Sequence, residues 1–150
     1  MSDIDWTYKP FGDLTPEDLY QILTLRNKVF VVEQNCVYAD TDGKDLSSFH
    51  LYGKKNNVLV AYARILPPQL AFEEASIGRV VTDPQYRRSG IGKELMEVAI
   101  EKTFNQFNVN SIRIGAQKYL LEFYKSLGFR TQGEIYLEDG IPHVEMILSK

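Results

Sequence analysis

The spacing of apolar and polar residues along the first third of the chain predicts a strand, a helix and a loop. Residues 4–8 alternate between apolar and polar types, which is the period of a half-buried strand. A helix is predicted from Pro16 to about residue 32, since Thr15 can cap it and Leu14 and Leu19 can form a hydrophobic staple. Residues 34–48 are rich in Asp, Ser and Gly and predict a long loop.

The rest of the chain predicts strands and helices in alternation. Two strands, 50–54 and 58–66, are predicted to form a hairpin across Asn56-Asn57. The remaining predicted elements are a strand at 75–82, a helix at 90–104, a strand at 111–116, a helix at 119–127 ended by Gly128, and strands at 130–137 and 143–148 around the turn 138–142. The strands flanking the helix 90–104 are expected to be parallel, with a right-handed crossover. This order predicts one α/β domain over residues 1–150, with a mixed sheet.

Candidate chemistry is concentrated between the strand 75–82 and the helix 90–104. That junction carries Arg87, Arg88, Gly90 and Gly92. Glycines let the backbone approach a ligand closely, and the start of a helix offers unpaired N–H groups and a partial positive charge. Arginine adds strong donors for phosphate oxygens. The junction therefore predicts a pyrophosphate site, and the alternative is an ordinary turn whose glycines only make it tight.

Two familiar phosphate-binding motifs do not fit this junction. A Walker A loop needs a glycine where this chain has Arg87, and a hydroxyl residue where it has Glu94. A dinucleotide fingerprint needs a third glycine where this chain has Leu95. What remains is Arg-x-x-Gly-x-Gly over residues 87–92. This hexapeptide resembles the acetyl-CoA pyrophosphate loop of the GNAT N-acetyltransferases.

Further segments carry the same resemblance. Phe123-Tyr-Lys-Ser-Leu-Gly-Phe129 is similar to the GNAT pattern Phe-Tyr-x-x-x-Gly-Phe, in which the tyrosine lies near the coenzyme sulfur. Segments spread over most of the chain look like the ElaA-type branch of this superfamily: Arg26-x-x-Val-Phe-Val-Val-Glu-Gln34, Asp45 to Leu51, Ile77-Gly-Arg-Val80, Ala116-Gln117 and Glu138-Asp-Gly-Ile-Pro-His143. The resemblance implies the GNAT fold, with a central mixed twisted sheet of about seven strands, helices on both faces, and a splay between strands four and five.

The resemblance also implies a reaction and a set of site residues. It implies acetyl-CoA as cosubstrate, no metal, and direct transfer of the acetyl group to an amine of a small molecule or protein. It places the backbone N–H of Val80 at the thioester oxygen and makes Tyr124 the acid for the leaving thiolate, although Tyr124 can also be a packing residue. The coenzyme-binding residues that it implies are Val80, Val81, Thr82, Arg87, Arg88, Ser89, Gly90, Ile91, Gly92 and Gln117.

The general base and the acceptor site are less well defined by the sequence. Many GNAT enzymes carry a glutamate where this chain has Ser76, so no base is carried over. Glu33, His50 and His143 are the candidates for binding the acceptor and accepting its proton, and a water chain is the alternative. His50, at the start of a strand, is more typical of a structural histidine.

Three other side chains raise alternatives. Arg64 and Arg79 interrupt apolar strands, so each is expected either to form a buried ion pair with Asp45 or Glu33, or to bind an acidic group of the acceptor. Simple strand alternation places the Arg79 side chain on the face opposite that of Val80. Cys36 is either an acyl carrier or, as is more usual for a lone thiol, structural.

Composition narrows the class of protein. The formal charge of -3 argues against general binding to nucleic acid or to an anionic membrane. The first residues show no secretory signal, no apolar run approaches a membrane span, and a single cysteine suits a reducing cytoplasm. A non-catalytic acyl-CoA-binding or regulatory module, favoured by Ser76, and an interaction protein that keeps only the fold are the alternatives to an enzyme. The sequence leaves a homodimer open.

Overall fold

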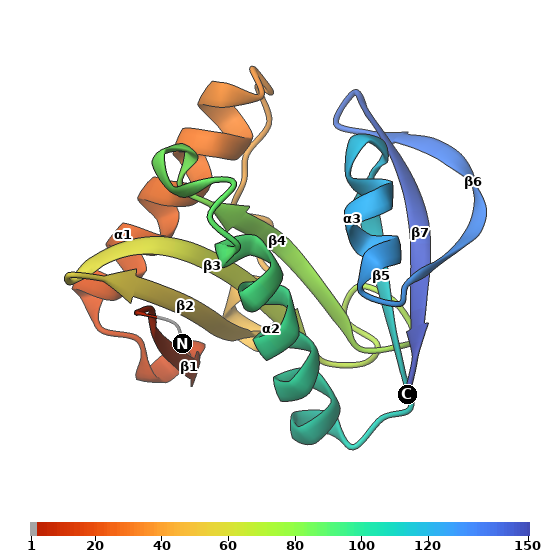
Figure 1. The fold of residues 1–150 in the computed structure, drawn as a ribbon, viewed down its shortest axis with the longest axis horizontal. Helices are drawn as coiled ribbons and strands as arrows, with labels where there is room; N and C mark the ends of the chain where they lie inside the picture. The colour runs from red at the N-terminus through yellow and green to blue at the C-terminus, as the bar shows by residue number, and fades with distance from the viewer. Residues whose placement is uncertain (1–2) are drawn as a thin grey trace.

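Two antiparallel sheets that meet at one end form the framework of residues 3–150, the part of the chain that this computed structural model describes (Figure 1). The first sheet has the order β1-β2-β3-β4, with β1 at Asp5–Pro10, β2 at Phe49–Lys55, β3 at Val58–Leu66 and β4 at Ser76–Thr82. The second has the order β5-β7-β6, with β5 at Ser111–Gln117, β6 at Arg130–Glu138 and β7 at Ile141–Ser149.

Within residues 3–150, the one strand-to-strand bridge between the two sheets lies where β4 and β5 begin. Ala75 and Ile112 form a parallel bridge there, and the Arg113 N–H donates a 3.0 Å hydrogen bond to the Ala75 carbonyl. Beyond this bridge the two strands diverge, and a gap opens between the sheets (Figure 1). The two strands are parallel at this bridge, as expected, but form no continuous pair in residues 3–150, and the splay between them is confirmed.

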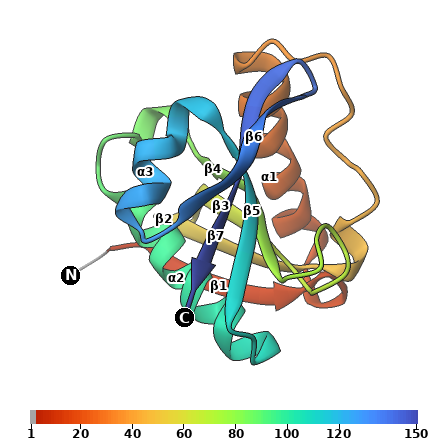
Figure 2. The same ribbon diagram turned by 90° about the vertical axis from the view of Figure 1, so that its right-hand side faces the viewer.

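Helices cover both faces of the first sheet (Figure 2). Helix α1, Pro16–Arg26, packs Ile22 and Leu25 against Tyr52 and Tyr62. The longer helix α2, Ile91–Phe107, packs its apolar stripe against the opposite face, in the cluster of Leu51, Ala61, Ala63, Leu95 and Ala99. Strand residues 51 and 52 lie on opposite faces because side chains alternate along a strand. The short helix α3, Leu121–Ser126, follows β5 through a 3-10 turn at Lys118–Leu120.

Turn residues place the hairpins close to where the sequence predicts them. Asn56 and Asn57 have φ values of 51° and 66°, so both take the left-handed conformation that a two-residue hairpin loop requires. The β6–β7 turn is tighter than expected. It is made by Asp139 and Gly140, with φ values of 52° and 77°, so Pro142 lies inside β7 rather than in the turn.

The first helix differs from its prediction in type. An α-helix ends at Arg26, and the chain continues as a π-helix over Asn27–Glu33. The N–H of Gln34 donates to the Val29 carbonyl over 3.0 Å, which is the i to i−5 spacing of a π-helix. Apolar periodicity over seven residues does not separate the two helix types, because both bury one stripe. No helix in residues 3–150 is long and apolar enough to cross a membrane.

A β-bulge interrupts β4 and removes the basis for the predicted orientation of Arg79. On β3, Tyr62 pairs with Val81 and Arg64 pairs with Gly78. Two residues of β4, Arg79 and Val80, therefore lie opposite the single β3 residue Ala63. Arg79 has a φ of 50°, in the left-handed region. The extra residue breaks the alternation of faces, so strand parity no longer decides where the Arg79 side chain points.

Candidate active site

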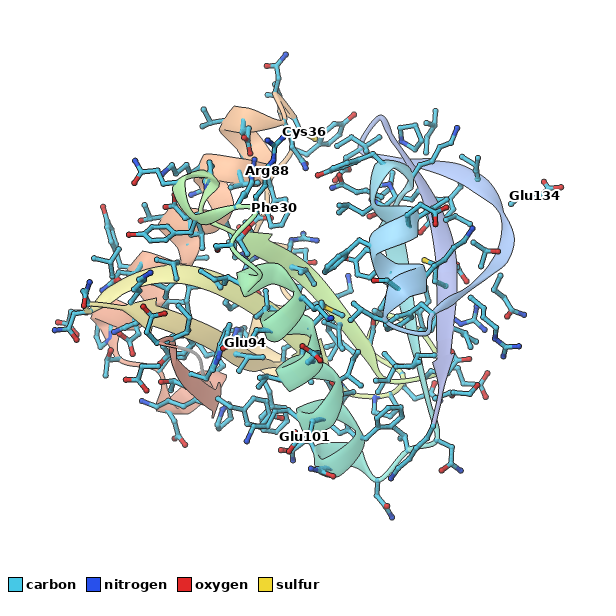
Figure 3. All side chains as sticks on the ribbon, in the orientation of Figure 1. Phe30, Cys36, Arg88, Glu94, Glu101 and Glu134 are labelled. Atoms are coloured by element: carbon cyan, nitrogen blue, oxygen red, sulfur yellow. The ribbon has the colours of Figure 1, made fainter. Side chains whose placement is uncertain are left out.

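A cavity of about 870 Å³ lies in the splay between β4 and β5. Its walls come from the π-helix and the loop after it, from β4, from the start of α2, and from β5, α3 and β7. Phe30, Cys36 and Arg88 lie at the edge of this gap on the α1 side (Figure 3). The predicted site residues that line the cavity are Val80, Val81, Thr82, Arg87, Arg88, Gly92, Gln117, Tyr124 and His143. Ser89, Gly90 and Ile91 belong to the same turn but do not line the cavity, and neither do Glu33 and His50.

The turn before α2 leaves the start of that helix open. Gly90 is the N-cap residue, with a φ of 85°, and no side chain of residues 3–150 caps the N–H groups of the first turn. A Cβ at Gly90 would have no neighbour within 4 Å, and one at Gly92 would touch only the Thr82 side chain at 3.9 Å. Packing therefore does not require glycine at either position. The φ of Gly90 by itself favours glycine, and the missing side chains leave open space beside the exposed N–H groups.

Arg87 is held by a carboxylate at the end of the π-helix. The two Nη atoms of Arg87 donate to the two carboxylate oxygens of Glu33, over 2.7 and 2.5 Å. The hydrogen bonds from Arg87 hold the pKa of Glu33 below its usual range. Glu33 was expected beside the acceptor amine, but the structure places it on the phosphate-loop arginine, where a lowered pKa makes it a weak base.

Tyr124 lies on α3 with its ring buried and its hydroxyl unpaired. The ring makes edge contacts with Phe123 and Phe129, at centroid distances of 5.2 and 5.9 Å. Burial raises the pKa of the Tyr124 hydroxyl, so it stays protonated at neutral pH. Its hydroxyl has no hydrogen-bond partner in residues 3–150, although the residue lines the cavity. The packing role and the role of a proton donor are therefore compatible.

His143 lies on β7, directly across from Gln117 on β5. Its Nδ1 is 2.7 Å from the Ile141 carbonyl oxygen, which can only accept, so Nδ1 carries the proton of the neutral ring and Nε2 keeps a lone pair. Nε2 is 3.7 Å from a Glu138 carboxylate oxygen, and the ring stacks on Tyr136. A neutral imidazole with a lone pair on Nε2 can accept a proton.

His50 has a different environment. It is 1% exposed, and both of its ring nitrogens are engaged, with the Tyr62 hydroxyl at 2.6 Å and the Asp45 carbonyl oxygen at 2.9 Å. Burial lowers the pKa of this histidine. Because His50 does not reach the cavity, the geometry favours the structural alternative over a role in binding the acceptor.

A buried network of three arginines and three aspartates ties the loop 34–48 to β3 and β4. Each aspartate accepts from two of the arginines: Asp40 from Arg26 and Arg79, Asp42 from Arg64 and Arg79, and Asp45 from Arg26 and Arg64. The predicted pair of Arg64 with Asp45 is thus confirmed, at 3.0 Å, whereas neither strand arginine pairs with Glu33. Sequence reasoning missed Arg26, Asp40 and Asp42. The available signal was three aspartates in one loop and three arginines within otherwise apolar elements.

The same loop also bridges the two sheets at the open end of the cavity. The Gln34 amide donates to the Gln117 side-chain oxygen over 3.2 Å. The Cys36 thiol lies 3.5 Å from the Asp139 carbonyl oxygen in the β6–β7 turn. Gln34 is a further residue that sequence reasoning missed, because its partner lies 83 positions away.

Comparison with known proteins assigns this chain to a family. A family model described as an acetyltransferase (GNAT) domain matches residues 14–150. The chain belongs to the GNAT acetyltransferase family. Escherichia coli ElaA is 43% identical over 145 residues, 95% of either chain, and a protein of Schizosaccharomyces pombe from the UPF0039 family is 44% identical over 99% of either chain.

Solved structures of GNAT relatives agree with the fold. The crystal structure of E. coli ElaA has a TM-score of 0.91 at 41% identity, covering 97% of this chain and 99% of that one. An acyl-CoA N-acyltransferase from Pseudomonas aeruginosa has a TM-score of 0.92 at 40% identity, with the same coverage. The GNAT fold and the ElaA-like branch are therefore confirmed, and the chain is a member of an acyltransferase family.

Proposed function

We propose that this protein is an acetyl-CoA-dependent N-acetyltransferase that moves the acetyl group directly to an amine. The observation that carries the proposal is that three groups line the same cavity: the open start of α2, the Tyr124 hydroxyl and the lone pair of His143 Nε2. The family description as an acetyltransferase domain and the acyl-CoA N-acyltransferase name of the Pseudomonas relative support it.

The residues present fit the coenzyme. The open space beside Gly90 and Gly92, with the uncapped N–H groups of α2, suits a pyrophosphate, and Arg88 lies beside the same space in the cavity wall. Strand β4 pairs with β3 on one edge, and its other edge has no strand partner in residues 3–150 beyond the bridge at Ala75. The pantetheine arm can add to that free edge as an extra strand.

The transfer then needs three groups from the protein. The amine nitrogen attacks the thioester carbonyl and loses a proton to His143 Nε2, while the N–C bond forms and the C–S bond breaks. The Val80 N–H, in the β4 bulge, donates to the carbonyl oxygen as negative charge develops, and one such donor can contribute roughly 3 kcal/mol. Tyr124 donates its proton to the departing thiolate and regains one from solvent.

The test is thiol release from acetyl-CoA with a panel of small and peptide amines, together with calorimetric titration of coenzyme A. We expect coenzyme binding and an amine-dependent release of thiol, with an acetylated amine detected by mass spectrometry. Coenzyme binding without acetyl transfer to any amine would favour the non-catalytic module, as Ser76 in place of a carboxylate suggests. Absence of coenzyme binding would refute both.

A further inference from the structure

Two consecutive residues at the end of the π-helix contact two residues that the proposed function assigns to the coenzyme. Glu33 binds Arg87 of the phosphate loop, and Gln34 binds Gln117 of β5. Glu33 and Arg87 come from segments 54 positions apart and from different elements. The geometry of the π-helix alone does not bring Glu33 to Arg87, so a function of this ion pair has to be sought in the phosphate loop.

The Glu33 contact takes up the part of Arg87 that would bind phosphate. An arginine binds a carboxylate or a phosphate through the same pair of parallel N–H bonds, and both Nη atoms of Arg87 donate to Glu33. A pyrophosphate at the start of α2 would bring further negative charge close to the Glu33 carboxylate. The negative charges of the carboxylate and the phosphate repel each other, so the two groups compete for Arg87.

The strength of the pair allows displacement. The Arg87 and Glu33 side chains are 40% and 41% exposed, and ion pairs in such positions contribute about 0–1 kcal/mol. A pyrophosphate that also gains the N–H groups of α2 can replace the carboxylate. Arg88, in the same wall, has no acidic partner in residues 3–150 and remains available.

We propose that Glu33 is an internal competitor for the pyrophosphate site, which occupies Arg87 until the coenzyme displaces its carboxylate. This role rests on the proposed function and replaces the expected place of Glu33 beside the acceptor amine. Glu33 thereby weakens the binding of ligands whose phosphates use Arg87, and it leaves ligands without a phosphate unaffected. In this role Glu33 occupies the Nη atoms of Arg87 and takes no part in the acyl transfer.

The experiment is the substitution Glu33→Gln, with coenzyme A affinity measured by calorimetry at low and high salt. Glutamine keeps the size of the side chain and removes its charge, so we expect coenzyme A to bind about 2–10-fold tighter at low salt, with a smaller gain at high salt. S-Acetylpantetheine, which lacks the pyrophosphate, should bind wild type and variant equally. Glu33→Asp should restore part of the competition.

A matched control separates this local effect from the change in net charge. Glu134 is exposed on β6, on the side of the molecule away from Arg88 (Figure 3), so Glu134→Gln makes the same charge change far from the phosphate loop. An equal gain from Glu134→Gln, or unchanged binding by Glu33→Gln, would overturn the inference. Weaker binding by Glu33→Gln would also overturn it and make Glu33 an orienting partner of Arg87. If wild type does not bind coenzyme A at all, the proposed function fails, and the inference fails with it.

Discussion

The sharpest test of the catalytic site is Tyr124→Phe, which removes one oxygen atom. The Tyr124 hydroxyl has no hydrogen-bond partner in residues 3–150, and the ring contacts with Phe123 and Phe129 persist in the variant. No protein hydrogen bond is lost, so we expect the free energy of unfolding to change by less than about 0.5 kcal/mol. Turnover should fall about 10–100-fold, equivalent to about 1.4–2.7 kcal/mol of transition-state stabilisation.

The pH dependence of the Tyr124→Phe effect follows from burial. Burial raises the pKa of the Tyr124 hydroxyl above its usual value, so the neutral acid is present at all pH values below about 10. The fold loss of turnover should therefore be constant between about pH 6 and 9. The same shift stabilises the fold only below the unfolded pKa, and that contribution is lost as pH rises through the folded value.

The assay is the initial rate of thiol release at saturating acetyl-CoA, with urea unfolding and coenzyme A titration on the same samples. Tyr20→Phe is the matched control, because Tyr20 is 75% exposed on α1, does not line the cavity and should retain wild-type turnover. Full activity of Tyr124→Phe would refute the proton-donor role and leave Tyr124 as a packing residue. A loss of activity accompanied by a loss of stability above about 2 kcal/mol would refute the reasoning from its unpaired hydroxyl.

Three further variants test the phosphate loop, the base and the ion-pair network. Gly90→Asp should abolish measurable coenzyme A binding in calorimetry. Gly90→Asn should retain most of the binding, because asparagine tolerates the left-handed backbone as well as aspartate does but carries no charge, and an equal loss in both variants would point to backbone strain. His143→Gln should lower turnover about 10–100-fold at neutral pH. The rate of the variant should recover as the pH rises, because the amine then loses its proton to solvent. An unchanged pH profile would exclude His143 as the base. Asp45→Asn should lower the free energy of unfolding by about 3–5 kcal/mol in urea, because Arg26 and Arg64 lose a buried partner, and a loss under 1 kcal/mol would contradict this. Burial would raise the pKa of Asp45 but the two arginines lower it, so the difference between wild type and Asp45→Asn should shrink as pH falls below about 4.

Local patterns in the sequence were enough to predict most of the elements and one half of the site. Thr15 caps α1 by accepting from the Asp18 N–H, as its place before Pro16 predicts. Asn56-Asn57 forms the tight hairpin turn, and Gly128 takes the left-handed conformation after α3, with a φ of 100°. Each of these features depends on a few neighbouring residues, so the sequence carries the whole of the information.

Family resemblance contributed what periodicity did not. Periodicity alone predicts an α/β domain with a mixed sheet, and the Arg-x-x-Gly-x-Gly and Phe-Tyr-x-x-x-Gly-Phe patterns added the GNAT fold with its splay between β4 and β5. The roles of Val80 and Tyr124 remain predictions that the variants above test.

The tertiary structure decided which charged groups meet. Glu33 pairs with Arg87 across 54 positions, and Arg79 finds Asp40 and Asp42 on a loop that lies 37 or more positions earlier in the chain. The β4 bulge and the π-helix likewise depend on how strands and helices pack, because the local sequence does not show where the extra residue is inserted. Ion pairs depend on distance in space rather than along the chain, and several acidic residues were equivalent candidates until the fold placed one of them beside each arginine.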